Sequence, residues 1–254
     1  MKCTILGCGA SPGTPVIACN CFVCSSGLDK NSRSRASILV EASNTKILVD
    51  VATDFRSQAL TNNIFAIDAI LFTHGHADHF AGIDDLKPIV YQQKKVIPSY
   101  MNKETWQIIN SGFGYAFNPE KGSIYSSLMV SNIIEDYSQI TIGDIAVKSF
   151  LQGHGSGKSL GFRFGDLAYS TDASSFPEES FQALKGVKIW IVDCLRYTHS
   201  PSHAMYEETL DWIDRIKPEL AILTHMGHDI DYEELKRILP KNIVPAYDGM
   251  VINF

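Results

Sequence analysis

Four side chains that can bind a metal stand within six residues, in the run Thr73-His74-Gly75-His76-Ala77-Asp78-His79. In a tight turn after a strand, residues i and i+2 can point to one ion, so His74 and His76 could share a first metal. Asp78 and His79 could then serve a second metal beside it. Neutral imidazoles and carboxylates suit Zn, Mn or Fe. This H-x-H-x-D-H spacing predicts a metal centre rather than a solvated polar loop, because such a dense set of histidines is rare without metal.

Further histidine and aspartate residues stand at the ends of predicted apolar strands. His154, Asp172 and His225 follow the predicted strands 145–151, 167–170 and 219–224, and His74 follows 68–73. Rigid scaffolds place functional side chains in the loops at such strand ends. The presence of His or Asp at the ends of four predicted strands is difficult to explain by packing alone.

Three cysteines form a second candidate metal site, in Cys19-Asn20-Cys21-Phe22-Val23-Cys24. A closed tetrahedral zinc site needs a fourth ligand, and His228, three residues after His225, is the best candidate. The surrounding segment 7–34 is predicted to be a long irregular loop, which such a site would hold in place. The alternative is a set of buried free thiols, a common state of cysteine.

Apolar periodicity predicts the elements that must position these residues. Strands are predicted at 2–7, 36–41, 46–50, 68–73, 95–99, 160–164, 167–170, 188–193 and 219–224, and the stretch 123–150 is predicted to form several antiparallel strands. Helices are predicted at 54–60, 83–89, 102–109, 204–216 and 232–239. We find no repeat and no linker-like segment, so residues 1–254 are predicted to form a single domain.

The composition excludes several classes of protein. The chain has 254 residues, of which 45% are apolar, and this excludes a disordered chain and allows a substantial core. Its 22 Lys and Arg against 28 Asp and Glu give a net charge of −6, which disfavours nucleic acid as a partner. No apolar run approaches the roughly 18 residues of a membrane span, and the first residues do not resemble a secretory signal. We therefore expect a cytoplasmic location, no membrane partner and no disulfide framework.

The H-x-H-x-D-H motif, followed in order by His154, Asp172 and His225, resembles the metallo-β-lactamase superfamily over nearly the whole chain. The resemblance implies an α/β fold, a four-layer αββα sandwich with metals at the edge of the two sheets. It implies two divalent active-site metals, Zn or Mn with Fe as a further option. One metal would be bound by His74, His76 and a later His, the other by Asp78, His79 and another later His, with Asp172 bridging both.

With the Cys19, Cys21, Cys24 and His228 set added, the chain resembles the phosphodiesterases of the bacterial carbon–phosphorus lyase pathway, the PhnP type, which open 5-phosphoribosyl 1,2-cyclic phosphate. The resemblance implies that these four residues hold one structural zinc, which ties the N-terminal loop to the loop of the last catalytic His. It also implies that His203, 22 residues before His225, acts as general acid or binds phosphate. His199 stays open as the alternative.

These observations predict a metal-dependent phosphodiesterase that hydrolyses a small, cyclic phosphodiester through a metal-bridged hydroxide. The candidate catalytic residues are His203 and Asp78. Asp50, at a strand end, could hydrogen-bond to a ligand His, and Arg33 and Arg35 could bind a substrate phosphate by bidentate pairing. A homodimer is common for such a fold.

Two alternatives remain at this stage. A ribonuclease of the tRNA 3′-processing type, or another nuclease, would share the metal site, but the net charge is negative and no long basic arm is present. A PqqB-like member without phosphodiesterase activity would share the fold, although some such proteins have an altered H-x-H-x-D-H motif and this chain has the intact one.

Overall fold

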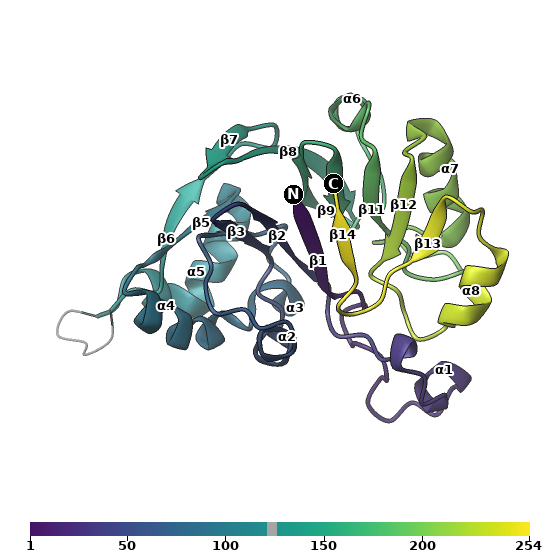
Figure 1. Ribbon diagram of the computed structural model, residues 1–254, viewed down its shortest axis with the longest axis horizontal. Helices are drawn as coiled ribbons and strands as arrows, with labels where there is room; N and C mark the ends of the chain where they lie inside the picture. Colours follow the sequence, from purple (N-terminus) through teal and green to yellow (C-terminus); the bar gives the residue numbers. More distant parts are fainter. Residues whose placement is uncertain (121–125) are drawn as a thin grey trace.

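The computed structural model describes residues 1–120 and 126–254, and its main feature is a pair of β-sheets packed face to face (Figure 1). The strands of the first sheet are β1 (Lys2–Gly7), β2 (Ser37–Ala42), β3 (Thr45–Val49), β4 (Ala69–Leu71), β5 (Ile97–Met101), β6 (Met129–Ile133) and β14 (Val251–Asn253). The strands of the second are β7 (Gln139–Ile142), β8 (Ile145–His154), β9 (Gly157–Phe164), β10 (Leu167–Ser170), β11 (Ile189–Asp193), β12 (Leu220–Thr224) and β13 (Ile243–Pro245). Their spatial orders are β14-β1-β2-β3-β4-β5-β6 and β13-β12-β11-β10-β9-β8-β7.

Helices cover the outer faces of both sheets (Figure 1). The first sheet is covered by α2 (Phe55–Thr61), α3 (Ala77–Phe80), α4 (Lys87–Gln93) and α5 (Lys103–Phe117), the second by α6 (Glu178–Leu184), α7 (Tyr206–Ile216) and α8 (Tyr232–Ile238). The short helix α1 (Phe22–Ser25) and a 3₁₀ turn (Asp29–Asn31) belong to a lobe below the sheets, and a second 3₁₀ turn (Ile83–Leu86) precedes α4. The fold is the expected αββα sandwich. None of the described helices is long and apolar enough to cross a membrane.

The central strands of the first sheet are buried on both faces, which explains their continuous apolar residues. In β3, Ile47 and Val49 face the core between the sheets, whereas Leu48 packs with the outer helices. In β4, Leu71 faces the inner core and Ile70 the outer cluster. Successive side chains of a strand point to opposite faces, so the sheet is held from both sides and its strand ends form a rigid edge.

The main departure from the predicted elements is the partner of β6. The stretch 123–150 was expected to form antiparallel strands; its first three residues lie outside the described residues. β7 and β8 do pair antiparallel, but β6 runs parallel to β5 and belongs to the other sheet. An apolar pattern identifies a strand but does not specify which strand it pairs with. α6 was not predicted, although Pro177 precedes it and its first turn is acidic, both signals of a helix start.

Candidate metal centre

The predicted ligands meet at one edge of the sandwich because the strands that carry them end there. His154 is the last residue of β8, Asp172 comes two residues after β10, and His225 directly follows β12. Asp50, Asp172 and His225 have left-handed backbone conformations, with φ of 63°, 54° and 57°. Residues other than glycine rarely adopt this region, and such strained positions cluster at functional sites.

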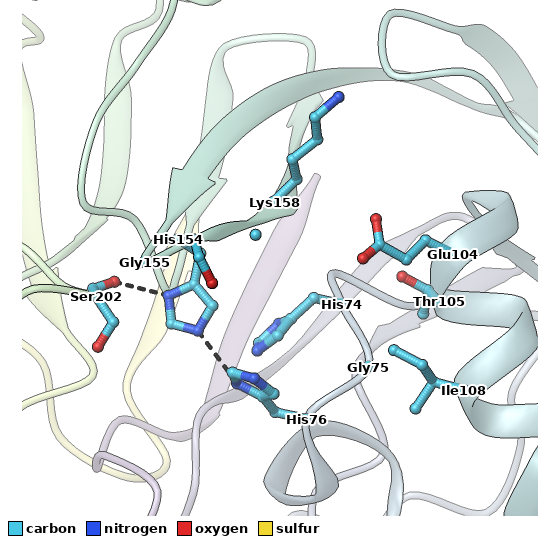
Figure 2. Close-up of a pocket in the computed structure, with 12 residues that line it drawn as sticks. His74, Gly75, His76, Glu104, Thr105, Ile108, His154, Gly155, Lys158 and Ser202 are labelled. Atoms are coloured by element: carbon cyan, nitrogen blue, oxygen red, sulfur yellow. Dashed lines mark hydrogen bonds between the residues drawn. The ribbon is translucent and has the colours of Figure 1, made fainter.

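A first group contains His74, His76, His154 and Asp172, which each offer one ligand atom, all within 4.8 Å of one another. Asp172 Oδ1 lies 3.8 Å from the Nε2 atoms of both His74 and His154. In Figure 2 the three histidines surround one side of a cavity, and His154 contacts His76 at 3.1 Å. Ligands about 2.1 Å from one tetrahedral zinc are roughly 3.4 Å apart, so these separations fit a metal.

A second group contains Asp78, His79 and His225. His79 Nε2 lies 3.3 Å from Asp78 Oδ2 and 3.2 Å from Asp172 Oδ2. His225 Nε2 lies 3.4 Å from Asp172 Oδ1. The two oxygens of Asp172 thus face both groups, which is the geometry that a bridging ligand requires.

Three of the histidines, His74, His79 and His154, fit metal ligation because Nδ1 has a polar partner outside the cluster, which leaves Nε2 to face inward. His79 donates from Nδ1 to Asp50 at 2.7 Å, and His154 donates from Nδ1 to the Ser202 carbonyl at 2.7 Å. His74 Nδ1 lies 3.0 Å from the Thr73 hydroxyl. The buried Nε2 atoms of His74, His79 and His225 have no hydrogen-bond partner among the described residues. Unpartnered buried nitrogens are costly, and divalent cations bound at the two groups would satisfy them.

The charges within the cluster are interdependent. Burial alone would raise the pKa of Asp172, but His225, His79 and His74 hold that pKa well below its ordinary value. Burial lowers the pKa of His79, yet Asp172 and Asp50 bring it well above normal. The pKa of His225 rises to about 9, since Asp172 and Asp193 outweigh its burial. The carboxylates of this cluster attract positive charge. That charge is supplied by protons, or by metal ions that take the place of the protons.

His203 lies beside this cluster, whereas His199, the alternative candidate, does not. Asp172, His203 and His225 form a further group of close ligand-type atoms. His203 Nδ1 lies 3.1 Å from Asp193 Oδ2 and 3.8 Å from Asp172 Oδ1. His199 is exposed, belongs to none of the groups found among the described residues, and accepts from Arg196 through its carbonyl. The geometry favours His203.

Asp193 is the residue that the sequence analysis missed. It is fully buried, accepts from the Ala173 amide at 2.8 Å, and also faces His225 Nδ1 at 3.6 Å. Burial would raise its pKa, but His203 and His225 hold the pKa below its ordinary value. The available signal was its position as the last residue of the apolar strand β11. Asp50 contacts a ligand-type histidine as predicted, through His79.

The cysteines and His228 also come together, from opposite ends of the chain. Their four ligand atoms lie within 4.8 Å of one another, and His228 Nδ1 is 3.3 Å from Cys19 Sγ and 3.4 Å from Cys21 Sγ. The Cys24 amide donates to Cys21 Sγ, and this contact together with His228 lowers the pKa of Cys21 to about 6. Thiolates are the form that binds zinc, so the donors fit a structural Cys₃His site.

The two arginines proposed for substrate binding have other partners. Arg33 is 1% exposed and donates to the carbonyls of Gly227 and Ile230, so it anchors the loop of His228. Arg35 pairs with Asp54 at 2.9 Å. Neither lines the cavity beside the metal groups. The two arginines were chosen because they are close in sequence to the cysteine loop. The sequence does not show that this loop packs against the C-terminal part of the chain, where Arg33 has its partners.

A cavity of about 280 Å³ opens beside the first group (Figure 2). His74, His76 and His154 form one wall, and Glu104, Thr105 and Ile108 of α5 form the opposite wall. The turn between β8 and β9, with Lys158, and Ser202 complete it. Its volume suits a small molecule whose reacting group contacts the histidines.

Comparison with known proteins agrees with this geometry. The model of the Beta-lactamase superfamily domain matches residues 45–226. A solved structure described as a new diphosphatase from the PhnP family has 34% sequence identity and a TM-score of 0.93, covering 100% of this chain and 97% of that one.

Two curated relatives carry different names. A protein named octanoyltransferase, from Porphyromonas gingivalis, is 32% identical over 255 residues, covering 98% of this chain but 51% of its own length. The exodeoxyribonuclease YycJ of Bacillus anthracis is 27% identical over 222 residues, covering 76% of this chain and 78% of the relative. The chain thus spans about half the length of the first relative.

Proposed function

Because this chain belongs to the family of the β-lactamase superfamily domain, we propose that it is a metal-dependent hydrolase of small phosphodiesters, cyclic ones in particular. The observation that carries the proposal is the position of Asp172 between two groups of ligand-type side chains. We assign His74, His76, His154 and Asp172 to one divalent metal, and Asp78, His79 and His225 to the other, with Asp172 shared because it also lies close to His79 and His225. Asp78 acts in catalysis through that second metal.

Two metals in these positions would supply Lewis-acid chemistry, by lowering the pKa of water and by neutralising charge on the phosphoryl oxygens. The chain's own residues prepare this site. Asp50 and the Ser202 carbonyl fix the ring orientation of His79 and His154, so that each Nε2 faces the cluster. Zn and Mn both suit this donor set.

His203 is the proton donor in this proposal. Its Nδ1 is hydrogen-bonded to the buried carboxylate of Asp193 at 3.1 Å, which fixes the orientation of the ring. Nε2 is then the atom that carries the proton for the leaving alkoxide. The conformation of the ring is further restrained by His225, which stacks on it with ring centroids 4.7 Å apart.

We assign the third metal, a structural zinc, to Cys19, Cys21, Cys24 and His228. A zinc there would connect the N-terminal lobe to the loop that follows His225, and would stabilise the position of that ligand. We further propose that residues 1–254 form one metallo-β-lactamase-like domain, that the protein acts in the cytoplasm, where thiolates stay reduced, and that it is a homodimer. Light scattering of the purified protein tests the dimer.

A second candidate reaction is hydrolysis of a diphosphate bond, which is favoured by the 34% identity to a protein described as a diphosphatase. Nuclease activity is named for the Bacillus anthracis relative, but a net charge of −6 disfavours a polyanionic substrate. Octanoyl transfer is the name of a protein twice as long, and we do not extend it to this chain because the described cluster consists of metal-type donors.

The test combines elemental analysis with turnover. We expect close to three metals per chain, together with hydrolysis of bis(p-nitrophenyl) phosphate and of 2′,3′-cyclic nucleotides or ribosyl 1,2-cyclic phosphate. A nucleoside diphosphate sugar in the same panel tests diphosphate cleavage. One tightly bound zinc without diester turnover, even after addition of Mn or Zn, would contradict the proposal and favour a member of the superfamily without phosphodiesterase activity.

A further inference from the structure

The wall of the cavity that faces the metal groups carries an unpaired carboxylate. Glu104 lines the cavity and forms no hydrogen bond or ion pair with any residue that the structure describes. Figure 2 shows its oxygens directed away from α5, toward the side of the cavity where His154 and Gly155 lie. The hydroxyl of Thr105, beside it, has no hydrogen-bond partner among the described residues either. Two polar groups without protein partners therefore face the place where a substrate must lie.

The position of this wall relative to the metal groups is fixed by packing. Glu104 and Ile108 are four residues apart, so they share one face of α5. Ile108 packs tightly on Gly75, between His74 and His76: a Cβ added at Gly75 would lie 2.6 Å from Ile108 Cδ1. A side chain at position 75 would force Ile108 to shift. This contact packs the face of α5 that carries Glu104 against the loop of His74 and His76.

The sign of the charge on the cavity wall opposite the histidines determines which chemical groups can bind at that wall. The other charged side chain in the cavity wall, Lys158, points away from the histidines in Figure 2 and lies 3.7 Å from Asp136. The charge directed inward opposite the histidines is therefore negative. A carboxylate accepts hydrogen bonds from hydroxyl groups and repels a second phosphoryl group.

Acidic residues are common in the first turn of a helix, where they interact favourably with the helix dipole. That effect explains a carboxylate at this point of the chain, but not its direction into the cavity. It also does not explain the neighbouring Thr105 hydroxyl on the same wall.

We propose that Glu104, with the Thr105 hydroxyl, is a specificity site that binds a hydroxyl group on the alcohol part of the substrate. The substrate class is then a phosphodiester of a polyol or sugar, with the phosphate at the metals and a free hydroxyl at Glu104. A second phosphoryl group is disfavoured at this position. This inference rests on the proposed function, because it assumes that a phosphodiester binds at the metal groups.

A series of cyclic phosphodiesters tests the proposal. Ethylene glycol cyclic phosphate has no free hydroxyl, glycerol 1,2-cyclic phosphate has one, and ribosyl 1,2-cyclic phosphate has more, while the reacting five-membered ring is the same. A hydrogen bond to a charged group corresponds to about a tenfold preference or more. We expect the metal-loaded wild type to prefer the glycerol compound to the ethylene compound by about tenfold in kcat/KM, mainly through KM.

Glu104→Ala should reduce this ratio toward one, and Glu104→Gln, which keeps an acceptor oxygen, should retain part of it. Asp214→Asn removes an exposed carboxylate on α7, outside the cavity wall, and should leave the ratio and the rates unchanged. A second readout is calorimetric binding of glycerol phosphate and of ethyl phosphate, which has no hydroxyl group. Wild type should bind glycerol phosphate more tightly, and Glu104→Ala should reduce this difference.

The outcomes separate the two proposals. If Glu104→Ala keeps the wild-type ratio, or if the wild type shows no preference, the specificity site is refuted while the phosphodiesterase assignment stands. If the metal-loaded wild type hydrolyses neither the cyclic series nor the nitrophenyl diester, the proposed function fails, and the specificity site fails with it.

Discussion

Replacement of His203 by glutamine gives the sharpest test of the assigned mechanism. Under the proposed assignment, a proton from His203 would matter only where the leaving group is a poor one, since an alkoxide needs protonation and a nitrophenolate is a stable anion. General acid catalysis contributes about 10²- to 10⁴-fold, which corresponds to roughly 3–5 kcal/mol of barrier. We expect His203→Gln to lower kcat by this factor for a cyclic alkyl phosphodiester and by less than about tenfold for bis(p-nitrophenyl) phosphate.

The structure also predicts that this variant folds. Asp193 Oδ2 keeps the hydrogen bond from the Ala173 amide when His203 is replaced, and the side chain of His203 is 14% exposed. His199→Gln is the matched control, because His199 is exposed and lies outside the clusters of the described residues. Both variants should keep the wild-type metal content and Tm.

The role of Asp193 is tested in the same assay. Asp193→Asn should show the same dependence on the leaving group, with a loss of about 10- to 100-fold. In the double variant with His203→Gln the two losses should add only in part, because Asp193 is hydrogen-bonded to His203 and also lies 3.6 Å from His225. Equal losses of His203→Gln with alkyl and nitrophenyl substrates would refute the general-acid assignment, and full activity would refute any catalytic role.

Three further predictions concern the metals and the lobe. Asp172→Ala should lose at least about 10²-fold in turnover and part of the bound metal, measured by mass spectrometry; unchanged metal content and rate would exclude a bridging role. Cys21→Ser should lose one metal per chain and lower Tm, whereas Cys3→Ser, in the core, should lower Tm but keep the metal. Asp231→Ala should cost roughly 1–2 kcal/mol, because Asp231 caps α8 and accepts from Asn31 at 2.7 Å. Partial burial would raise the pKa of Asp231, but Asn31 and backbone amides hold that pKa below 3.8; its contribution is therefore present above that pH and lost as pH falls further. In metal-free protein, urea unfolding at pH 7 and pH 3 should show a smaller difference between wild type and variant at pH 3, and an equal difference would be inconsistent with the ionised cap.

Local patterns were sufficient for much of the fold. Apolar strands such as β3 and β4 were found because a sheet buried on both faces requires nearly continuous apolar residues. The fold class was predicted from a resemblance carried by the H-x-H-x-D-H motif and by His154, Asp172 and His225 in the same order, and the observed sandwich agrees with it. The pairing of β6 with β5 was not predicted, because strand partners depend on contacts between segments far apart in the chain.

The candidate site shows the same difference between features set by local sequence and features set by contacts between distant segments. The H-x-H-x-D-H run and the cysteine cluster are visible because their ligands are neighbours in sequence, and residue type alone limits them to metal chemistry. The positions of His154, Asp172 and His225 were expected from strand ends and from the family resemblance. Their roles as ligands stay predictions until metals are measured.

The sequence by itself therefore determined the residue types, the strands that carry them and the class of chemistry. Only the tertiary structure decided which groups face one another. Asp172 lies between two sets of donors, and Asp193 is hydrogen-bonded to His203. Arg33 donates to the loop of His228, and Glu104 lines the cavity opposite the histidines. The physical reason is that residue type and local periodicity set what a segment can form. Distances between side chains far apart in sequence arise only when two sheets and their helices pack against each other.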